Sequence, residues 1–248
     1  MASLSGRRAV VAGASGRYGP AVVRRLAATG AEVIAADRNV DGIRDLPSGV
    51  RALPCDMSED AVTDAVSALE GEGRPIDIVV TCPPVLTAVE APTAADLRTA
   101  FALAVEPVLS WTTAATNVMA ARRGGAIVHV TGLSGLGGWR GAASAGAAFA
   151  AIHNLVQNFA LAFAASEVRV NALVPGVDAG EARAIAATAG RAEQEIVSRI
   201  PLGLTMPEAA LTDALLYLAH PGSTYVSGQV LAVDGGWSTW GRLHAVAS

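Results

Sequence analysis

The chain has 248 residues, of which 52% are hydrophobic and 16% charged, with 26 glycines and a net charge of −4. This length fits one domain with a large core, and an acidic balance with scattered arginines excludes a basic nucleic-acid-binding surface. No continuous apolar run reaches the roughly 20 residues of a membrane span, and the first residues lead into a strand rather than a signal peptide, so we expect a cytoplasmic protein without membrane contact.

The predicted elements alternate between strands and helices from residue 8 onward. We expect strands at 8–12, 31–36, 50–53, 76–80, 126–130, 168–173 and 229–233. We expect helices at 20–29, 58–69, 94–121 with a bend at Pro107, from the loop after residue 130 to about 165, and 207–219, with an exposed, mobile helical excursion at 178–199. This order is typical of βαβ units. The sequence therefore predicts one α/β domain over 1–248, a doubly wound parallel sheet flanked by helices, with ligand sites beyond the carboxyl ends of its strands.

A glycine-rich turn follows the first strand. Gly13, Gly16 and Gly19 lie where backbone N–H groups and a helix N-terminus can meet a pyrophosphate. Asp37 ends the second strand, where a carboxylate accepts hydrogen bonds from an adenosine ribose and repels a 2′-phosphate. This favours NAD over NADP, although the neighbouring Arg38 works against that preference. The alternative interpretation is structural: a tight turn with close helix packing for the glycines, and a solvated turn residue for Asp37.

Four further segments accompany this turn: CDM around Asp56, VRVNALVPG at 168–176, PLGLTMPE at 201–208 and YVSGQVLAVDGG at 225–236. With them, the whole chain resembles the classical short-chain dehydrogenase/reductase family. The resemblance implies a single Rossmann-type domain with a seven-stranded parallel sheet, an NAD site to which Asp56 contributes, and dimers or tetramers built through the two long helices and the C-terminal strand. The glycine spacing here is GxxGxxG, whereas the family more often has GxxxGxG.

The same resemblance implies a relay of asparagine, serine, tyrosine and lysine, each supplying a polar atom. Aligned with the family, those positions hold Ala104, Gly132, Ala145 and Phe149. The chain contains no lysine, and its three tyrosines lie outside this segment, at positions 18, 217 and 225. We therefore assign no catalytic residue and expect the usual hydride transfer to be lost.

The residues expected around the nicotinamide half also depart from the family pattern. The family's Asn-Asn-Ala-Gly after the fourth strand is Thr-Cys-Pro-Pro at 81–84, where two prolines remove N–H donors. Gly180 replaces the threonine that usually follows Pro-Gly, and the rings of Tyr18 and Phe149 add bulk. NAD binding thus stays open at this stage, with the adenine half better kept than the nicotinamide half.

The leading hypothesis is a non-catalytic subunit of an oligomer, either of this chain alone or with an active NAD-dependent paralogue. The helix after the expected site carries a face of small residues suited to close helix contact: Ala142, Ala143, Gly146, Ala147 and Ala150. Two alternatives remain. One is an atypical NAD(P)-dependent oxidoreductase. The other is a non-redox enzyme of the cyclase, dehydratase or epimerase type that acts on a small molecule.

Such a non-redox enzyme needs one acid or base in a shaped pocket, and Asp178, His153 and Cys82 are the candidates. A pocket lining is available from nearby polar and aromatic residues: Thr131, Ser134, Trp139, Arg140, Ser144 and Glu181. The structural interpretation is that His129 and His153 are packed histidines and that Cys55 and Cys82 are reduced, buried thiols. We expect no metal site, because the cysteines and histidines lack metal-ligand spacing.

Overall fold

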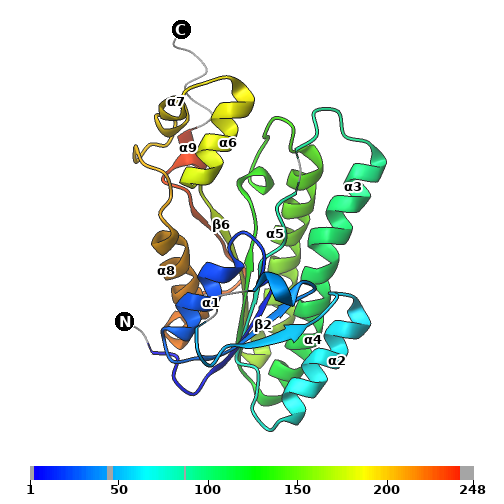
Figure 1. The fold of residues 1–248 in the computed structure, drawn as a ribbon. Coiled ribbons are helices and arrows are strands. Elements are labelled where there is room, and N and C mark those ends of the chain that lie inside the picture. Colours follow the sequence, from blue (N-terminus) through cyan, green and yellow to red (C-terminus); the bar gives the residue numbers. More distant parts are fainter. Residues whose placement is uncertain (1–2, 44–46, 87, 241–248) are drawn as a thin grey trace.

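The computed structural model describes residues 3–43, 47–86 and 88–240, so the ends of the predicted 1–248 domain lie outside the described part. Seven parallel strands form one sheet in the order β3-β2-β1-β4-β5-β6-β7 (Figure 1). The strands are β1 (Arg8–Ala12), β2 (Glu32–Asp37), β3 (Arg51–Pro54), β4 (Ile78–Thr81), β5 (Gly125–Val130), β6 (Val168–Pro175) and β7 (Val230–Val233). The predicted fold class, a single doubly wound α/β domain, is confirmed.

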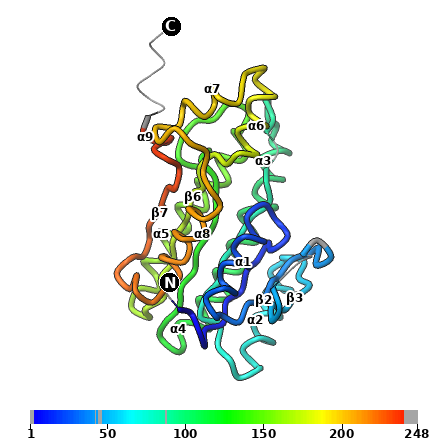
Figure 2. Tube along the Cα trace, turned by 60° about the vertical axis from the view of Figure 1, so that its left-hand side comes forward, coloured from blue at the N-terminus to red at the C-terminus, as the bar shows by residue number. Residues whose placement is uncertain are grey.

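Helices cover both faces of the sheet, which Figures 1 and 2 show from two directions. Val10 and Ile34 point into the core on the side of α2, α4 and α5, whereas Val11 and Val33 point to the side of α1 and α8. This alternation is the period of two that strands impose on side chains. The helices are α1 (Gly19–Ala27), α2 (Glu59–Gly71), α3 (Ala94–Ala100), α4 (Glu106–Arg122), α5 (Ala143–Phe163), α6 (Ala179–Ala189), α7 (Glu193–Val197), α8 (Glu208–Ala219) and α9 (Trp237–Trp240).

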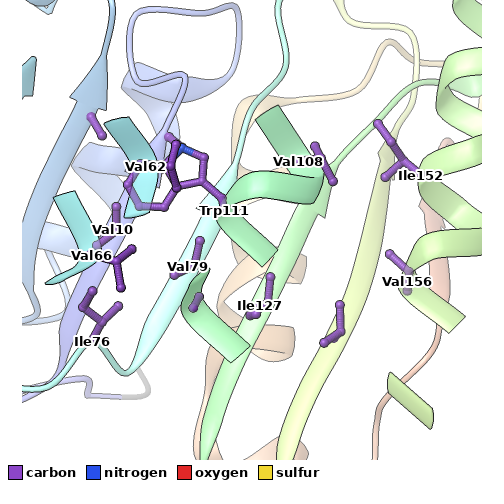
Figure 3. Close-up of a cluster of buried hydrophobic side chains, with 14 of the residues drawn as sticks. Val10, Val62, Val66, Ile76, Val79, Val108, Trp111, Ile127, Ile152 and Val156 are labelled. Atoms are coloured by element: carbon purple, nitrogen blue, oxygen red, sulfur yellow. The ribbon is translucent and has the colours of Figure 1, made fainter. Parts of the chain in front are cut away.

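The larger core lies between the sheet and helices α2, α4 and α5. In Figure 3, Trp111 of α4 lies beside Val62 of α2, while Ile127 of β5 lies farther along the sheet toward Ile152 of α5. Trp111 is completely buried, and an indole of this size contributes one of the largest apolar areas available to a core. This packing fixes α4 and α5 against the central strands, so the residues that follow β4 and β5 have defined positions.

The predicted helix at 94–121 is interrupted, as expected from Pro107, but by a specific device. Helix α3 ends in a π-helical turn, Phe101–Val105, and α4 begins directly after it with Pro107 in its first turn. Proline has no N–H and its ring collides with a carbonyl one turn earlier, and a wider turn relieves that collision. The predicted bend is thus realised as a local change of helix type.

The excursion expected at 178–199 is helical but not simply exposed. Helices α6 and α7 bury Val177, Ala182 and Ile196 in a third, smaller apolar cluster. Trp139, from the loop after β5, stacks on Trp237 with ring centroids 5.4 Å apart and joins that cluster. Most residues of 178–199 are exposed, as expected, and a few apolar side chains anchor the segment over the carboxyl edge of the sheet. Its mobility stays a prediction.

Helix α5 with the short turn after it, 143–166, is long and apolar enough by composition to cross a membrane. The sequence expectation overlooked it, because many alanines raise mean hydropathy without forming a continuous run of large side chains. The helix packs on β6 and α3 within the α/β fold, which is the placement of a core helix rather than of a span. Only 28% of its apolar window is buried, so it leaves an uncovered apolar face.

Candidate functional site

The glycine-rich turn lies at the point where the strand order reverses. β1 pairs with both β2 and β4, and their carboxyl ends are in register, with Ala12 opposite Ala36 and Thr81. Ligands of doubly wound folds bind at this switch point. The predicted position of the site thus agrees with the topology of the sheet.

Backbone packing alone requires two of the three glycines. Gly13 has a φ of +80°, and a Cβ placed on it would lie 2.1 Å from the carbonyl oxygen of Cys82. A Cβ on Gly19, the first residue of α1, would lie 2.4 Å from the carbonyl oxygen of Gly13. Gly16 is less crowded, with its nearest atom at 3.1 Å. The structural interpretation of this turn therefore holds by itself, and it is compatible with a phosphate site.

Asp37 is buried at the end of β2 and organises the turn. Its two carboxylate oxygens accept hydrogen bonds from the backbone N–H groups of Ser15, at 2.8 Å, and Asn39, at 2.9 Å. Each oxygen keeps a free lone pair, because a carboxylate can accept about four hydrogen bonds. Asp37 is therefore held in place while it retains the capacity to accept hydroxyl donors.

A cavity of about 290 Å³ opens beside Asp37. Its polar rim is formed by the glycine turn, Arg38 and Asn39, and its walls are largely apolar. Those walls are formed by Ala12, Met57, Cys82, Pro83, Pro84, Ala102, Leu103, Pro107, Val108 and Trp111. An apolar slot with a few polar groups at one edge has the shape that a flat heterocycle joined to a sugar requires.

The predicted binding residues divide into two groups. Gly13, Gly16 and Asp37 line the cavity, whereas Gly19 serves the packing of α1 and Asp56 is exposed outside the lining. Hydrogen bonds with Ser58, first with its side chain and then with its backbone N–H, hold the pKa of the Asp56 carboxyl below the usual range. Asp56 does not line the cavity, and its expected role in cofactor binding stays a prediction.

The loop after β5 and the first turns of α5, where the resemblance implies the relay, pack around the ring of Phe149. A Cβ on Gly132 would lie 2.6 Å from a ring carbon of Phe149, and one on Gly135 would lie 2.7 Å from Cβ of Phe149. Ala145 is buried one turn earlier on α5. Gly132 and Phe149 are therefore neighbours in space, and the ring occupies the room that a side chain at position 132 would need.

Next to this ring, the side chains of Thr131 and His153 form a hydrogen bond with each other. Thr131 Oγ1 lies 3.0 Å from Nε2 of His153, and the same hydroxyl lies 3.5 Å from the carbonyl oxygen of Leu173. Burial lowers the pKa of His153, and a hydrogen bond with the backbone of Gly135 offsets part of that effect. His153 is accordingly a neutral, packed histidine rather than an exposed base.

The other candidate acids and bases are buried or already paired. His129 lies between two threonine hydroxyls, with Thr81 Oγ1 at 2.8 Å and Thr112 Oγ1 at 3.2 Å, and burial lowers its pKa to about 3. Burial raises the pKa of Cys82 to about 12, which keeps it a thiol. Arg140 is exposed and pairs with Glu90. Among the described residues, no cluster of histidine, cysteine and acidic side chains could hold a metal.

Sequence reasoning named Asp178 and Glu181 but missed their partner, Arg17. The guanidinium of Arg17 donates to Asp178 Oδ2 at 2.6 Å and to Glu181 Oε2 at 3.3 Å. Asp178 also caps α6 by accepting from the N–H of Glu181. Burial alone would raise the pKa of Asp178, but the hydrogen bonds, first that from Arg17, bring it below the usual range. The signal was available: Arg17 stands where the spacing GxxxGxG places its middle glycine.

Comparison with known proteins places this architecture. A sequence profile described as enoyl-(acyl carrier protein) reductase matches residues 13–238. A galactitol 2-dehydrogenase (L-tagatose-forming) of Cereibacter sphaeroides is 31% identical over 246 residues, covering 96% of this chain and 97% of its own. The gluconate 5-dehydrogenase of Gluconobacter oxydans is 30% identical, with coverages of 94% and 95%. The chain belongs to the short-chain dehydrogenase/reductase family.

A solved structure extends the comparison within the short-chain dehydrogenase/reductase family. It is assigned as an NAD(P)-dependent gluconate 5-dehydrogenase from Beutenbergia cavernae with NADP bound at low occupancy. It shares 29% identity and a TM-score of 0.84, covering 95% of this chain and 98% of that one. Family relatives of this chain are thus dehydrogenases, and they bind NAD or NADP.

The two halves of a dinucleotide meet different surroundings in this family member. The adenosine half fits the cavity beside Asp37, where buried carboxylate oxygens retain lone pairs and apolar walls face each other. The second half would extend over β4, β5 and β6. There it meets the Phe149 ring and the carboxylates paired with Arg17. The residues present fit the first half of the cofactor and not the second.

Proposed function

We propose that this chain is a non-catalytic member of the short-chain dehydrogenase/reductase family, which works as a subunit beside an active, NAD-dependent relative in the cytoplasm. The observation that carries the proposal is the Phe149 ring packed against Gly132. These two positions correspond to the lysine and the serine of the family relay. Position 149 carries an aromatic ring and position 132 carries no side chain, so the ring fits into the space beside the glycine.

Hydride transfer to a carbonyl needs a group that gives the oxygen a proton and a donor that polarises it. No lysine is present in the chain, and the tyrosines lie in the glycine turn and in the C-terminal third. Ala145, at the tyrosine position, offers no proton. The nearest titratable groups are His153, held by Thr131, and the carboxylates that bind Arg17. What this segment supplies is packing, not proton transfer.

The uncovered face of α5 supports the role in an assembly. Leu161 is 81% exposed, whereas Phe159 and Phe163 on the same helix stack on each other and pack against the core. Leu109 on the neighbouring α4 is also exposed. Exposed leucines on two neighbouring long helices favour burial against a partner surface. A second family member, with the same two helices, has the matching shape.

Two experiments test the proposal together. The purified chain is assayed with NADH and NADPH against ketoses and keto acids, with the Gluconobacter gluconate 5-dehydrogenase as a positive control. We expect no turnover above the uncatalysed rate. The chain is then co-expressed with family members that retain tyrosine and lysine, and complexes are isolated. Leu161→Arg should abolish the complex, whereas Val85→Arg, at an exposed position after β4, should not. Robust turnover by the chain alone contradicts the proposal.

The second candidate function is an NAD(P)-dependent dehydrogenase of polyols or sugar acids. It is favoured by the names of the two relatives that align over nearly the whole chain, a galactitol and a gluconate dehydrogenase. The same assay run in the oxidative direction, with galactitol or gluconate and NAD or NADP, decides between the two. Substrate-dependent formation of NADH or NADPH that scales with the concentration of this chain would establish the second function.

A further inference from the structure

The Arg17 ion pairs join segments that are far apart in the sheet. Arg17 belongs to the turn after β1, and Asp178 follows β6, so the pair bridges over the carboxyl ends of β4 and β5. Three strand spacings separate β1 from β6, which is about 14 Å across the sheet. Arg17 makes two bonds to Asp178, through Nε at 3.1 Å and Nη2 at 2.6 Å. Both nitrogens donate to the same carboxylate oxygen, Oδ2, and hydrogen bonds between charged partners are stronger than neutral ones.

This bridge lies on the route of a dinucleotide. In a doubly wound sheet the pyrophosphate sits at the glycine turn, and the second nucleoside continues over the strands on the far side of the switch point. In this chain that continuation leads to the Arg17 side chain, which rests on the Tyr18 ring with 5.3 Å between its Cζ and the ring centroid. Beyond it stand two carboxylates, which repel the phosphate and ribose oxygens of a nucleotide.

The adenosine side of the switch point has no such obstruction. The cavity beside Asp37 is bounded by Gly13, Ser15 and Gly16 and does not include Arg17 in its lining. A ligand that ends at a diphosphate would fill this cavity without displacing the ion pairs. A dinucleotide would have to break them, which offsets part of the affinity that its second half adds.

We propose that Arg17, held by Asp178 and Glu181, restricts this chain to adenine mononucleotides such as ADP, which bind at least as tightly as NADH. The inference rests on the non-catalytic function proposed above and names the ligand of that subunit. Arg17 is thus a specificity-determining residue that removes the advantage of the nicotinamide half. The ion pairs replace a cofactor contact by a contact within the protein.

The test is a comparison of dissociation constants by isothermal titration calorimetry. The purified chain is titrated with ADP and with NADH under identical salt and pH. We expect the constant for ADP to be equal to, or lower than, that for NADH, within about threefold. An NADH constant more than about tenfold below that for ADP would overturn the inference. Failure of ADP to bind at millimolar concentration would overturn it as well.

Variants identify the cause. Arg17→Ala should lower the dissociation constant for NADH by about fivefold or more and leave that for ADP within about twofold. Arg24→Ala is the matched control, since it removes another exposed ion pair, with Glu208, from the next turns of α1. Asp178→Asn keeps the cap of α6 while weakening the bridge, and it should give an intermediate gain for NADH. Equal weakening of ADP and NADH by Arg17→Ala would show that Arg17 binds the diphosphate, and would overturn the proposal.

The two proposals fail in different ways. NADH binding more than about tenfold tighter than ADP, without turnover, overturns the mononucleotide preference and leaves the non-catalytic function standing. Turnover with NADH overturns the proposed function, whichever nucleotide binds more tightly. Circular dichroism of each variant verifies folding, and Asp178→Asn preserves the test if Arg17→Ala does not fold.

Discussion

The adenosine side and the relay side of the cleft have the same backbone frame but different contents. On the adenosine side, Asp37 is held by two backbone N–H groups and faces a cavity. On the relay side, the Phe149 ring fills the space beside Gly132, and Thr131 and His153 satisfy each other. The difference teaches that one backbone frame can carry an open polar cavity and a filled apolar space side by side, because the strands that carry both sides are held by the core.

The largest effect is expected from a substitution in the glycine turn, which both sides of the cleft share. Gly13→Ala should destabilise the chain by about 3 kcal/mol or more, since the new Cβ meets a backbone oxygen and the left-handed φ is strained. Urea denaturation followed by circular dichroism measures the change. Gly137→Ala is the control, because nothing lies within 4 Å of its Cβ. A Gly13→Ala protein as stable as the control would show that the turn relaxes freely.

A smaller effect on stability is expected from the protonation of His129, which is buried on β5. Its pKa is lowered to about 3 in the folded chain, against 6.5 without burial. Between these values the unfolded state binds a proton that the folded state does not, so stability falls as the pH drops from 6.5 toward 3. We expect a loss of about 2 to 3 kcal/mol between about pH 7 and pH 4.5.

His129→Asn should remove that part of the acid dependence, because the amide does not titrate. Urea denaturation of both proteins across this pH range compares the slopes rather than the absolute stabilities, which the substitution also changes. Equal slopes in the two proteins would mean that His129 is protonated as easily in the fold as in the unfolded chain.

The smallest effect concerns the filled relay side. Gly132→Ser should cost about 1 to 2 kcal/mol, because the new side chain overlaps the Phe149 ring, which must turn away. In a Phe149→Ala background the same serine should cost less, since the room is free. A double-mutant cycle by urea denaturation should therefore give a coupling of about 0.5 kcal/mol or more between the two positions. Additive costs would show that the ring does not occupy the serine's space.

Much of the fold was predictable, because its cause is local. The apolar run at 31–36 predicted β2, and Ser58 predicted the start of α2. Ser58 does cap α2, because its side chain accepts a hydrogen bond from the backbone N–H of Ala61. The bounds of most elements differ from the prediction by one to three residues, since helix ends depend on the neighbours that satisfy their last carbonyls. The apolar cluster that anchors α6 and α7 could not be predicted in the same way, because Trp139 and Trp237 meet only in the folded chain.

The sequence by itself determined the family pattern, the glycine turn, the acidic end of β2 and the absence of any lysine, all of which are properties of residues and their spacing. Tertiary structure alone decided what those residues contact. It placed Asp56 outside the cavity, packed Phe149 onto Gly132, and brought Arg17 to carboxylates 161 and 164 positions away along the chain. Contacts at such separations depend on the order of strands in the sheet, which no local pattern encodes.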